Sequence, residues 1–507
     1  MNDTGHIVSE AEAPAVASLE PGLPVEQVAK DGNGGDYSAF IASKSQLGGD
    51  CGFEPVCRNE KLFGFQTYLT EKALRKGRSA IFADCGLGKT PMQLTWAQNV
   101  VEKTSGRALI LTPLAVGAQT VEEGKKFGVE CARSRDGSLP DERIVITNYE
   151  KLHLFKPEDF SGVVCDESSI LKSYSGETKR AVTRFMLKVP YRLLCTATPS
   201  PNDYVELGTS AEALGEIGYS EMLERFFVMT EKIPHSMGLV KQQNKGRGQH
   251  FAKLSFRVHQ AINKWTLKGH AEDYFWRWIC SWASACRMPS DVGFENESFV
   301  LPQMIERQYT VEPSRPAEGY LFSIPAVGLN EERDERRRTL KERCELAANL
   351  AAHKDPVVIW CHLNSEGDEL ERLIPDAIQV SGADSDDEKE TAYRKFGDGT
   401  CRALIIKPKI GAWGMNWQHC AHVITFATHS YEQYYQATRR CWRFGQKRPV
   451  VVDSISTTAE VHVRESMLRK SQQAKEMFKR MVMHMNHSVK VERLSHEMQQ
   501  IEKPAWI

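Results

Sequence analysis

Short apolar runs alternate along this chain with longer stretches that place charged residues on one face of a helix. In the N-terminal half the apolar runs lie at 79–83, 108–111, 143–147, 162–165 and 191–196. A run that is apolar throughout, rather than at every second position, is typical of a strand buried on both faces. Such strands, separated by helices, predict a parallel sheet covered by helices on both sides.

The same rhythm returns in the C-terminal half. Apolar runs recur there at 356–360, 377–380, 402–406, 422–426 and 450–453. They predict a second parallel sheet. We therefore expect an α/β protein with two sheet-containing lobes, the first at 37–214 and the second at 302–458, preceded by a linker helix.

The remaining segments have other patterns. Residues 1–36 are rich in Ala, Glu, Pro, Gly and Asp, which predicts a disordered tail. Residues 215–301 predict a mostly helical insertion with a polar loop at 237–251. A highly charged helix is expected at 331–350, and helices without strands at 459–507.

Residues 83–90 (ADCGLGKT) lie between an apolar run and a helix-like stretch. Backbone N–H groups at a helix N-terminus form an anion site, and Gly86 and Gly88 permit the tight turn that this requires. Lys89 can reach the β- and γ-phosphates of a nucleotide, and Thr90 can ligate Mg²⁺. The segment predicts half of an ATP site, although a plain glycine turn is the simpler alternative.

Asp166 and Glu167 directly follow the apolar run at 162–165. Ligand sites in parallel sheets form at the carboxyl ends of strands. We expect Asp166 to hold Mg²⁺ and Glu167 to orient and polarise the attacking water. An Asp-Glu pair taken alone is more often a solvated turn, and its place after the phosphate loop favours the functional reading.

The segment 436–443 (QATRRCWR) supplies cations that could reach the same phosphates from the second lobe. Arg440 and Arg443 are three positions apart and share a helix face. Guanidinium groups match phosphate oxygens, which suits an arginine-finger role. The alternative is a solvated basic helix.

Composition limits the class of protein. The chain has 507 residues, of which 41% are hydrophobic and 26% charged, with a net charge of −1. No apolar run is long enough for a membrane span, and the N-terminus lacks the pattern of a secretory signal. Thirteen scattered cysteines, several in strand-like runs, favour a cytoplasmic protein with reduced thiols. Because the net charge is close to zero, any binding to a polyanion must depend on local clusters of basic residues.

The series of motifs resembles the superfamily-two helicases, specifically their Swi/Snf-like branch and the compact DEAD/DEAH-type members that phages and prophages encode. The family's motifs occur in their usual order over about residues 60–470. They are FQ at 65–66, ADCGLGKT at 83–90, ILTPL at 110–114, DESS at 166–169, TATP at 196–199, IWCH at 359–362, GAWGMN at 411–416 and QATRRCWRFGQ at 436–446.

The resemblance implies that both lobes are RecA-like and that ATP and Mg²⁺ are the cofactors. It implies that Gln66 recognises adenine, that Gln436 lies at the nucleotide, and that Arg440 and Arg443 are the family's two arginines. The residues implied to contact nucleic acid are Thr112, Pro113, Lys409 and Asn416.

Four positions, in three of the motifs, depart from the family pattern. Ser169 stands where a coupling residue is usual, and Lys407-Pro408 replaces small hydroxyl residues that hold phosphate. Arg439 stands where Asp is common. These departures leave the interlobe link and the grip on the nucleic-acid strand open.

The insertion has a local basic bias. Between His235 and Arg287 there are nine Lys or Arg residues and two acidic residues. We expect its tryptophans to pack it onto the first lobe and its basic residues to face DNA, with stacking of the tryptophans on bases as the alternative. A basic helix at 464–480 is expected to pack on the second lobe, rather than to form a separate partner site.

Together these features predict a Mg²⁺-dependent ATPase that translocates along DNA, with duplex favoured. The alternatives are a strand-separating DNA or RNA helicase, a clamp that binds ATP without turnover, and the motor subunit of a restriction or defence complex. The last would require a nuclease or methyltransferase partner.

Overall fold

The computed structural model describes residues 50–233, 262–296, 299–312, 329–411 and 415–499. The predicted tail at 1–36 and the predicted loop at 237–251 lie outside the described residues, as do Lys241, Lys245, Arg247, Lys253 and Arg257 of the insertion. Contacts within the chain separate Met1–Leu47 from a compact unit, Gly48–Ile507. All that follows concerns the second unit.

Seven parallel strands form the first sheet, in the order β3-β4-β2-β5-β6-β1-β9. The five apolar runs of the N-terminal half are its strands β1, β2, β4, β5 and β6, which confirms that prediction. The strands are β1 (Arg78–Ala83), β2 (Ala108–Thr112), β3 (Ala132–Arg133), β4 (Ile144–Asn148), β5 (Gly162–Asp166), β6 (Tyr191–Cys195) and β9 (Ala283–Cys286).

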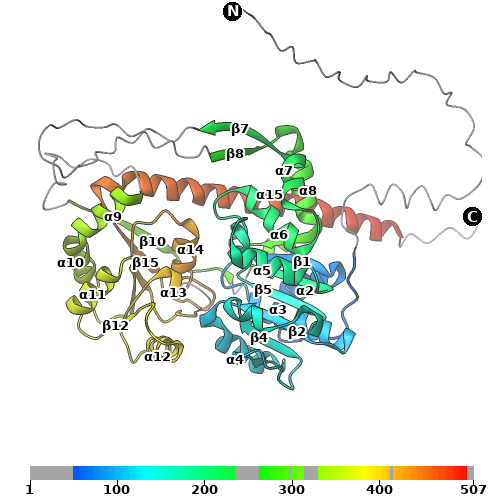
Figure 1. Cartoon of the computed structure of the whole chain (residues 1–507), viewed down its shortest axis with the longest axis horizontal. Helices are drawn as coiled ribbons and strands as arrows, with labels where there is room; N and C mark the ends of the chain where they lie inside the picture. The colour runs from blue at the N-terminus through cyan, green and yellow to red at the C-terminus, as the bar shows by residue number, and fades with distance from the viewer. Residues whose placement is uncertain (1–49, 234–261, 297–298, 313–328, 412–414, 500–507) are drawn as a thin grey trace, which may run out of the picture. The chain divides into compact units, whose positions relative to one another are not determined.

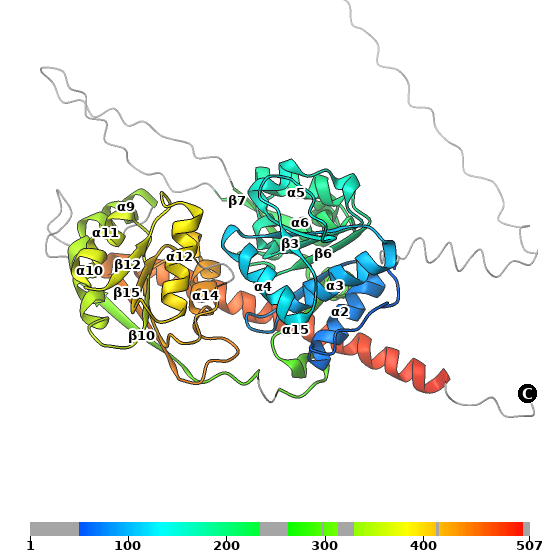
Figure 2. The ribbon, with the colours of Figure 1, turned by 90° about the horizontal axis from the view of Figure 1, so that it is seen from below.

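Helices cover both faces of this sheet, with α2, α3 and α4 on one side and α5 and α6 on the other (Figure 2). Successive residues of β1 point to opposite faces, so that Phe82 joins one buried cluster and Ile81 the other. The helices are α2 (Gly64–Lys76), α3 (Lys89–Thr104), α4 (Gly117–Phe127), α5 (Glu177–Met186) and α6 (Leu207–Leu214).

The range 215–301 contains the expected helices and also three strands. Helices α7 (Tyr219–Phe226) and α8 (Glu272–Trp282) flank an antiparallel hairpin of β7 (Phe227–Ile233) and β8 (Ile262–Leu267). Strand β9 then pairs with β1 and extends the first sheet. Its sequence, ASAC, is too short and too small in its side chains to show a strand pattern, so this pairing is a tertiary effect.

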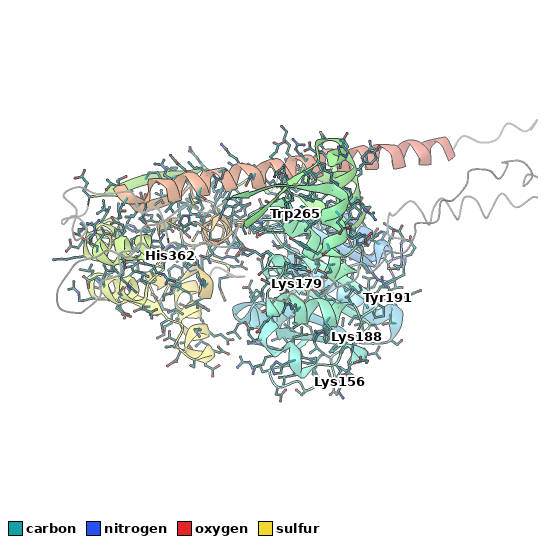
Figure 3. The ribbon with its side chains drawn as sticks, turned by 45° about the horizontal axis from the view of Figure 1, so that its top comes forward. Lys156, Lys179, Lys188, Tyr191, Trp265 and His362 are labelled. Atoms are coloured by element: carbon teal, nitrogen blue, oxygen red, sulfur yellow. The ribbon has the colours of Figure 1, made fainter. Side chains whose placement is uncertain are left out.

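The tryptophans of α8 belong to the core of the first lobe. Trp276, Trp278 and Trp282 are at most 4% exposed and lie in the same apolar cluster as residues of β1 and β5. Trp265, which Figure 3 labels on the ribbon of β8, packs against that cluster as well. This confirms the prediction that the aromatic residues attach the insertion to the first lobe, and it excludes base stacking by the three buried rings.

Six parallel strands form the second sheet, in the order β10-β15-β14-β11-β13-β12. All five predicted runs are present, and β10 is an additional edge strand paired with β15 along its whole length. The strands are β10 (Met304–Val311), β11 (Val357–Trp360), β12 (Ala377–Val380), β13 (Ala403–Ile406), β14 (His422–Phe426) and β15 (Val450–Thr457).

The helices around the second sheet include two where one charged helix was expected. Thr339 interrupts the range 331–350, with backbone angles outside the helical region, and separates α9 from α10. The helices are α9 (Leu329–Arg338), α10 (Leu340–Leu350), α11 (Asn364–Leu373), α12 (Asp386–Gly397), α13 (Pro408–Gly411) and α14 (Tyr431–Thr438).

A single long helix, α15 (Val461–Gln499), ends the described part of the chain and is the orange-to-red ribbon of Figure 1. The prediction that this segment packs on the second lobe is wrong in part, because Met477, Phe478 and Met481 lie in the core of the first lobe. Met467 packs against the second lobe. The polar-looking helix thus has an apolar stripe shared between both sheets. Within the described ranges, no helix is long and apolar enough to cross a membrane.

Candidate nucleotide site

The phosphate loop connects β1 to α3 and needs glycine at two positions. Gly86 has φ +89° and Gly88 has φ +73°, a region that other residues rarely adopt. A Cβ at Gly88 would lie 2.2 Å from the amide nitrogen of Gln66, and a Cβ at Gly86 would lie 2.9 Å from the backbone nitrogen of Phe444. The second contact shows that residues of the second lobe pack directly on the loop.

Lys89 is the first residue of α3, and its side chain folds back over the loop. Its ammonium donates to the carbonyl oxygens of Ala83 at 3.1 Å and Asp84 at 3.4 Å. Thr90 follows on the same helix and is partly exposed. A lysine, a hydroxyl and the free N–H groups of a 16-residue helix therefore meet at one point, which is an anion-binding arrangement.

Asp166 ends β5, a neighbour of β6, which in turn pairs with β1. One oxygen of its buried carboxylate accepts a hydrogen bond from Gln93 of α3 at 2.7 Å. Burial, with the charge of Glu167 second, raises the pKa of Asp166 to about 6, although Gln93 and Lys89 oppose the shift. A cation near this carboxylate would restore the ionised form.

Glu167 is held in an unusual backbone conformation, with φ +52°. Residues other than glycine adopt this conformation at a cost in strain, and such residues are enriched at functional sites, although Ser105 at the end of α3 has it as well. Its carboxylate accepts a hydrogen bond from Thr196 at 3.4 Å, and Thr196 lies at the end of the adjacent strand β6. Because the strands are parallel, the loop, both acids and the TATP segment all lie at one edge of the sheet, the one formed by the carboxyl ends of its strands.

Helix α14 of the second lobe lies against this edge. The amide nitrogen of Gln436 is 3.5 Å from the carboxylate of Glu167 and 3.4 Å from the hydroxyl of Thr198. A guanidinium nitrogen of Arg440 is 3.9 Å from the same carboxylate. The two segments that the sequence suggested as halves of one site are therefore in contact.

Arg443 is a desolvated cation beside the loop. Its Cβ lies 3.4 Å from the Cβ position of Gly86, and one guanidinium nitrogen donates to the carbonyl of Met415 at 3.0 Å. Burial, followed by the nearby charge of Arg440, lowers the pKa of Arg443 to about 10. Its buried Nε has no hydrogen-bond partner, and within the described ranges no carboxylate pairs with it. Such a group favours an added anion.

Gln66 connects α2 to the loop. Its side-chain oxygen accepts from the backbone N–H of Phe63 at 3.0 Å, and its nitrogen donates to the carbonyl of Leu87 at 2.9 Å. The side chain is buried. These bonds position the phosphate loop, and recognition of adenine by Gln66 stays a prediction.

The four residues predicted to contact nucleic acid occupy different surroundings. Pro113 and Lys409 line a cavity of about 440 Å³ whose walls are helices and loops of both lobes. Thr112 is buried, with its hydroxyl donating to the carbonyl of Thr147 at 3.4 Å. The side-chain oxygen of Asn416 is buried and has no hydrogen-bond partner among the residues that the structure describes. Their contacts with nucleic acid stay predictions.

The residues present fit a nucleotide and a magnesium ion. The loop, Lys89 and the unpaired guanidinium of Arg443 suit phosphate oxygens. In the part of the chain that the structure describes, no group of three or more His, Cys, Asp or Glu side chains could hold a metal. Magnesium usually takes one or two protein ligands together with phosphates and water, which Thr90 and Asp166 could supply.

Known proteins resemble this chain in part. Residues 339–445 match the family described as "Helicase conserved C-terminal domain". This match lies wholly within the second lobe. The matched region runs from the end of α9 to the residue after Phe444, so it includes α14, Arg440 and Arg443.

A longer similarity covers both lobes. The chain is 23% identical over 442 residues to a Bacillus subtilis (strain 168) protein named "Putative ATP-dependent helicase/translocase YwqA". The match covers 77% of this chain and 45% of that protein, so the chain spans less than half of its relative's length.

The structure adds residues that the sequence reading did not place in the site. Asp84 of the loop contacts Tyr435 and Arg439 of the second lobe, and Gln93 holds Asp166. Arg439 was noted only as a departure from the family pattern. Its pairing with Asp84 could have been suspected from the opposite charges, but nothing local in either segment indicates the contact.

Proposed function

We propose that this chain is an ATP-dependent nucleic-acid motor that hydrolyses ATP with Mg²⁺ and uses the closure of its two lobes to move along DNA. The observation that carries the proposal is the contact of Gln436 and Arg440 with Glu167, across two sheets, beside a phosphate loop. A site built from both lobes responds to nucleotide by changing their contact, which is the requirement for coupling hydrolysis to movement.

The residues have separate roles. Lys89 and the loop N–H groups bind the phosphates, and Thr90 and Asp166 hold Mg²⁺, which supplies charge neutralisation at the phosphates. Glu167, fixed by Thr196 and Gln436, orients the attacking water.

Arg440 and Arg443 complete the site from the second lobe. Both are held by the carbonyl of Met415, at 3.4 Å and 3.0 Å, so their guanidinium groups are presented together. Charge that develops on the transferred phosphoryl group would be stabilised by these already desolvated cations. An arginine in this role is worth about a thousandfold or more in turnover.

The substrate is proposed as DNA, with duplex favoured, in keeping with a Swi/Snf-like motor. The relative's name combines helicase and translocase, and the cavity lined by Pro113 and Lys409 is formed by residues of both lobes. Of the nine basic residues between His235 and Arg287, the structure describes four, namely Lys264, Lys268, Arg277 and Arg287, together with the two acidic residues Glu272 and Asp273. Backbone contacts of this kind position a protein without reading sequence.

The test is the rate of ATP hydrolysis with duplex DNA, single-stranded DNA, RNA or no nucleic acid. We expect hydrolysis to require Mg²⁺ and to be stimulated most by duplex DNA. Lys89→Ala should abolish hydrolysis, and Lys103→Ala, at the exposed other end of the same helix, should not. Hydrolysis that persists in Lys89→Ala, or is absent in the wild-type protein under every condition, contradicts the proposal.

The relative's name also favours a strand-separating helicase as the second candidate. A forked duplex and a triplex separate the two, because a translocase displaces the third strand without unwinding the fork. A motor that serves a nuclease or methyltransferase partner would show hydrolysis and translocation alone, and would recover the second enzyme on co-purification.

A further inference from the structure

Asp84 links the phosphate loop to the second lobe. One carboxylate oxygen accepts from the backbone N–H of Cys85 at 2.6 Å and from the phenol of Tyr435, and the other pairs with the guanidinium of Arg439. The side chain is about a tenth exposed. A loop residue five positions before Lys89 is therefore bound to two residues that are more than 350 positions away.

Arg439 is as closely held on the other side. Its side chain is 6% exposed, donates to the carbonyl of Trp442 at 3.2 Å, and lies over the rings of Tyr435 and Trp442 at 5.4 Å and 4.6 Å. A guanidinium stacked on two rings and paired with a carboxylate has little freedom to turn. The pair is therefore rigid as well as buried.

Arg439 lies beside the residues that reach Glu167, so its contact with Asp84 bears on their position. Arg439 directly follows α14 and precedes Arg440, and Gln436 lies three residues earlier on the same helix. At the other end of α14, Glu432 pairs with Lys172 of the first lobe. The helix is thus attached to the first lobe at both ends, and the groups that reach Glu167 lie between or beside the attachments.

A buried ion pair adds little to stability, because desolvation offsets the attraction. Removing one partner is costly, since the other charge is left buried and unpaired. Neither Asp84 nor Arg439 is needed for phosphate binding, which Lys89, the loop N–H groups and Arg443 provide. The ion pair is therefore suited to fixing the position of α14 relative to the phosphate loop.

We propose that Asp84 and Arg439 are positioning residues, forming a charge-paired contact that seats α14 on the phosphate loop and thereby delivers Arg440 and Arg443 to the nucleotide. This inference rests on the proposed function for its kinetic consequence. The contact itself, and its effect on the loop, do not depend on hydrolysis.

The test uses Asp84→Asn, Arg439→Gln and the double variant in the full chain. Asparagine keeps an acceptor for Cys85 and Tyr435 while removing the charge. Arg372→Gln, an arginine of α11 that is 64% exposed and pairs with Glu369 on its own helix, is the matched control. Thermal unfolding and circular dichroism establish that each variant is folded.

Arg439→Gln should lower kcat by about 30-fold or more, the lower end of the cost of breaking a buried charge pair. The KM for ATP should change little, because neither side chain contacts the nucleotide. The double variant should be more active than the product of the single effects, because it leaves no unpaired buried charge. Arg372→Gln should match the wild type.

Amide hydrogen exchange gives a readout independent of turnover. In Arg439→Gln the backbone of 84–88 and of 431–443 should exchange faster than in the wild type and in Arg372→Gln. If the wild-type protein hydrolyses no ATP but this change occurs, the proposed function fails and the positioning contact stands.

Three results would overturn the inference. They are unchanged kcat in both single variants, a raised KM at constant kcat, which would mean direct nucleotide binding, and single effects that multiply without coupling in the double variant. If Arg439→Gln does not fold, Asp84→Asn and the exchange measurement carry the test, and unchanged exchange in that variant sinks it.

Discussion

Replacing Arg443 by methionine should make the nucleotide-free protein more stable and the enzyme far less active. The pKa of this guanidinium is lowered to about 10 from an ordinary value of 12.5, chiefly by burial. A shift of this size corresponds to at most about 3.5 kcal/mol of destabilisation of the charged form, because one pKa unit is worth about 1.4 kcal/mol. Partial exposure of the residue reduces the figure.

Two other terms decide the sign. Methionine has a similar length and fills the space beside Gly86 without a charge. The lost hydrogen bond to the carbonyl of Met415 costs about 1 kcal/mol, and Arg440 still donates to that carbonyl at 3.4 Å. The balance is a gain of about 1–2 kcal/mol in the free energy of unfolding without nucleotide, within the bound set by desolvation.

Urea unfolding of both proteins with and without a non-hydrolysable ATP analogue and Mg²⁺ measures this balance. The wild type should be stabilised by the analogue much more than Arg443→Met, and kcat of the variant should fall about a thousandfold. Arg448→Met, an arginine that is 48% exposed and paired with Asp355, serves as the control. A variant that is less stable without nucleotide, or that keeps normal turnover, would refute the argument that Arg443 is a desolvated cation awaiting phosphate.

Three further predictions follow from single contacts. Gly88→Ala should lower kcat/KM at least about a hundredfold, because its Cβ would displace Gln66 and the loop, and the folded variant should lose affinity for ATP analogues in a binding assay. Burial lowers the pKa of His362, labelled in Figure 3, to about 4, so its contribution to stability is present above about pH 6.5 and is lost as the pH falls toward 4. The free energy of unfolding of His362→Asn in urea should therefore depend less on pH over this window than that of the wild type. Equal pH dependence in the two proteins would contradict the prediction. Glu390 of α12 pairs with Arg133 at 2.9 Å and with Arg135 at 3.4 Å. Glu390→Gln should therefore steepen the salt dependence of DNA affinity by about one to two units of slope in a fluorescence titration, whereas an unchanged slope would place both arginines outside the nucleic-acid path.

The local parts of the candidate site were readable from the residues. Gly86, Gly88 and Lys89 specify a strand-to-helix turn because the conformation needs φ values that only glycine adopts freely. Asp166 ends β5 and Glu167 directly follows it, so their place at the carboxyl end of the sheet follows from the same apolar pattern. The strands were predictable for the same reason, since burial on both faces leaves no alternative to a continuous apolar run.

The features that the sequence did not predict are those that depend on contacts with residues far away in the chain. Strand β9 has only four small residues and becomes a strand because the edge of β1 is free to pair with it. The apolar positions of α15 are spread along a polar helix, and only packing divides them between the lobes. Thr112 illustrates the reverse case, since its motif suggests an exposed contact and its hydroxyl points into the sheet.

Periodicity and turn chemistry are local properties, and they were enough to predict two parallel sheets, which the structure confirms, and the glycine loop, acids and arginines of the candidate site. The pairing of Asp84 with Arg439, 355 residues apart, is of another kind. It exists only because the two sheets bring their edges together and exclude water from the contact, which makes each charge require the other. Burial of this sort is created by packing and has no signature in either segment alone.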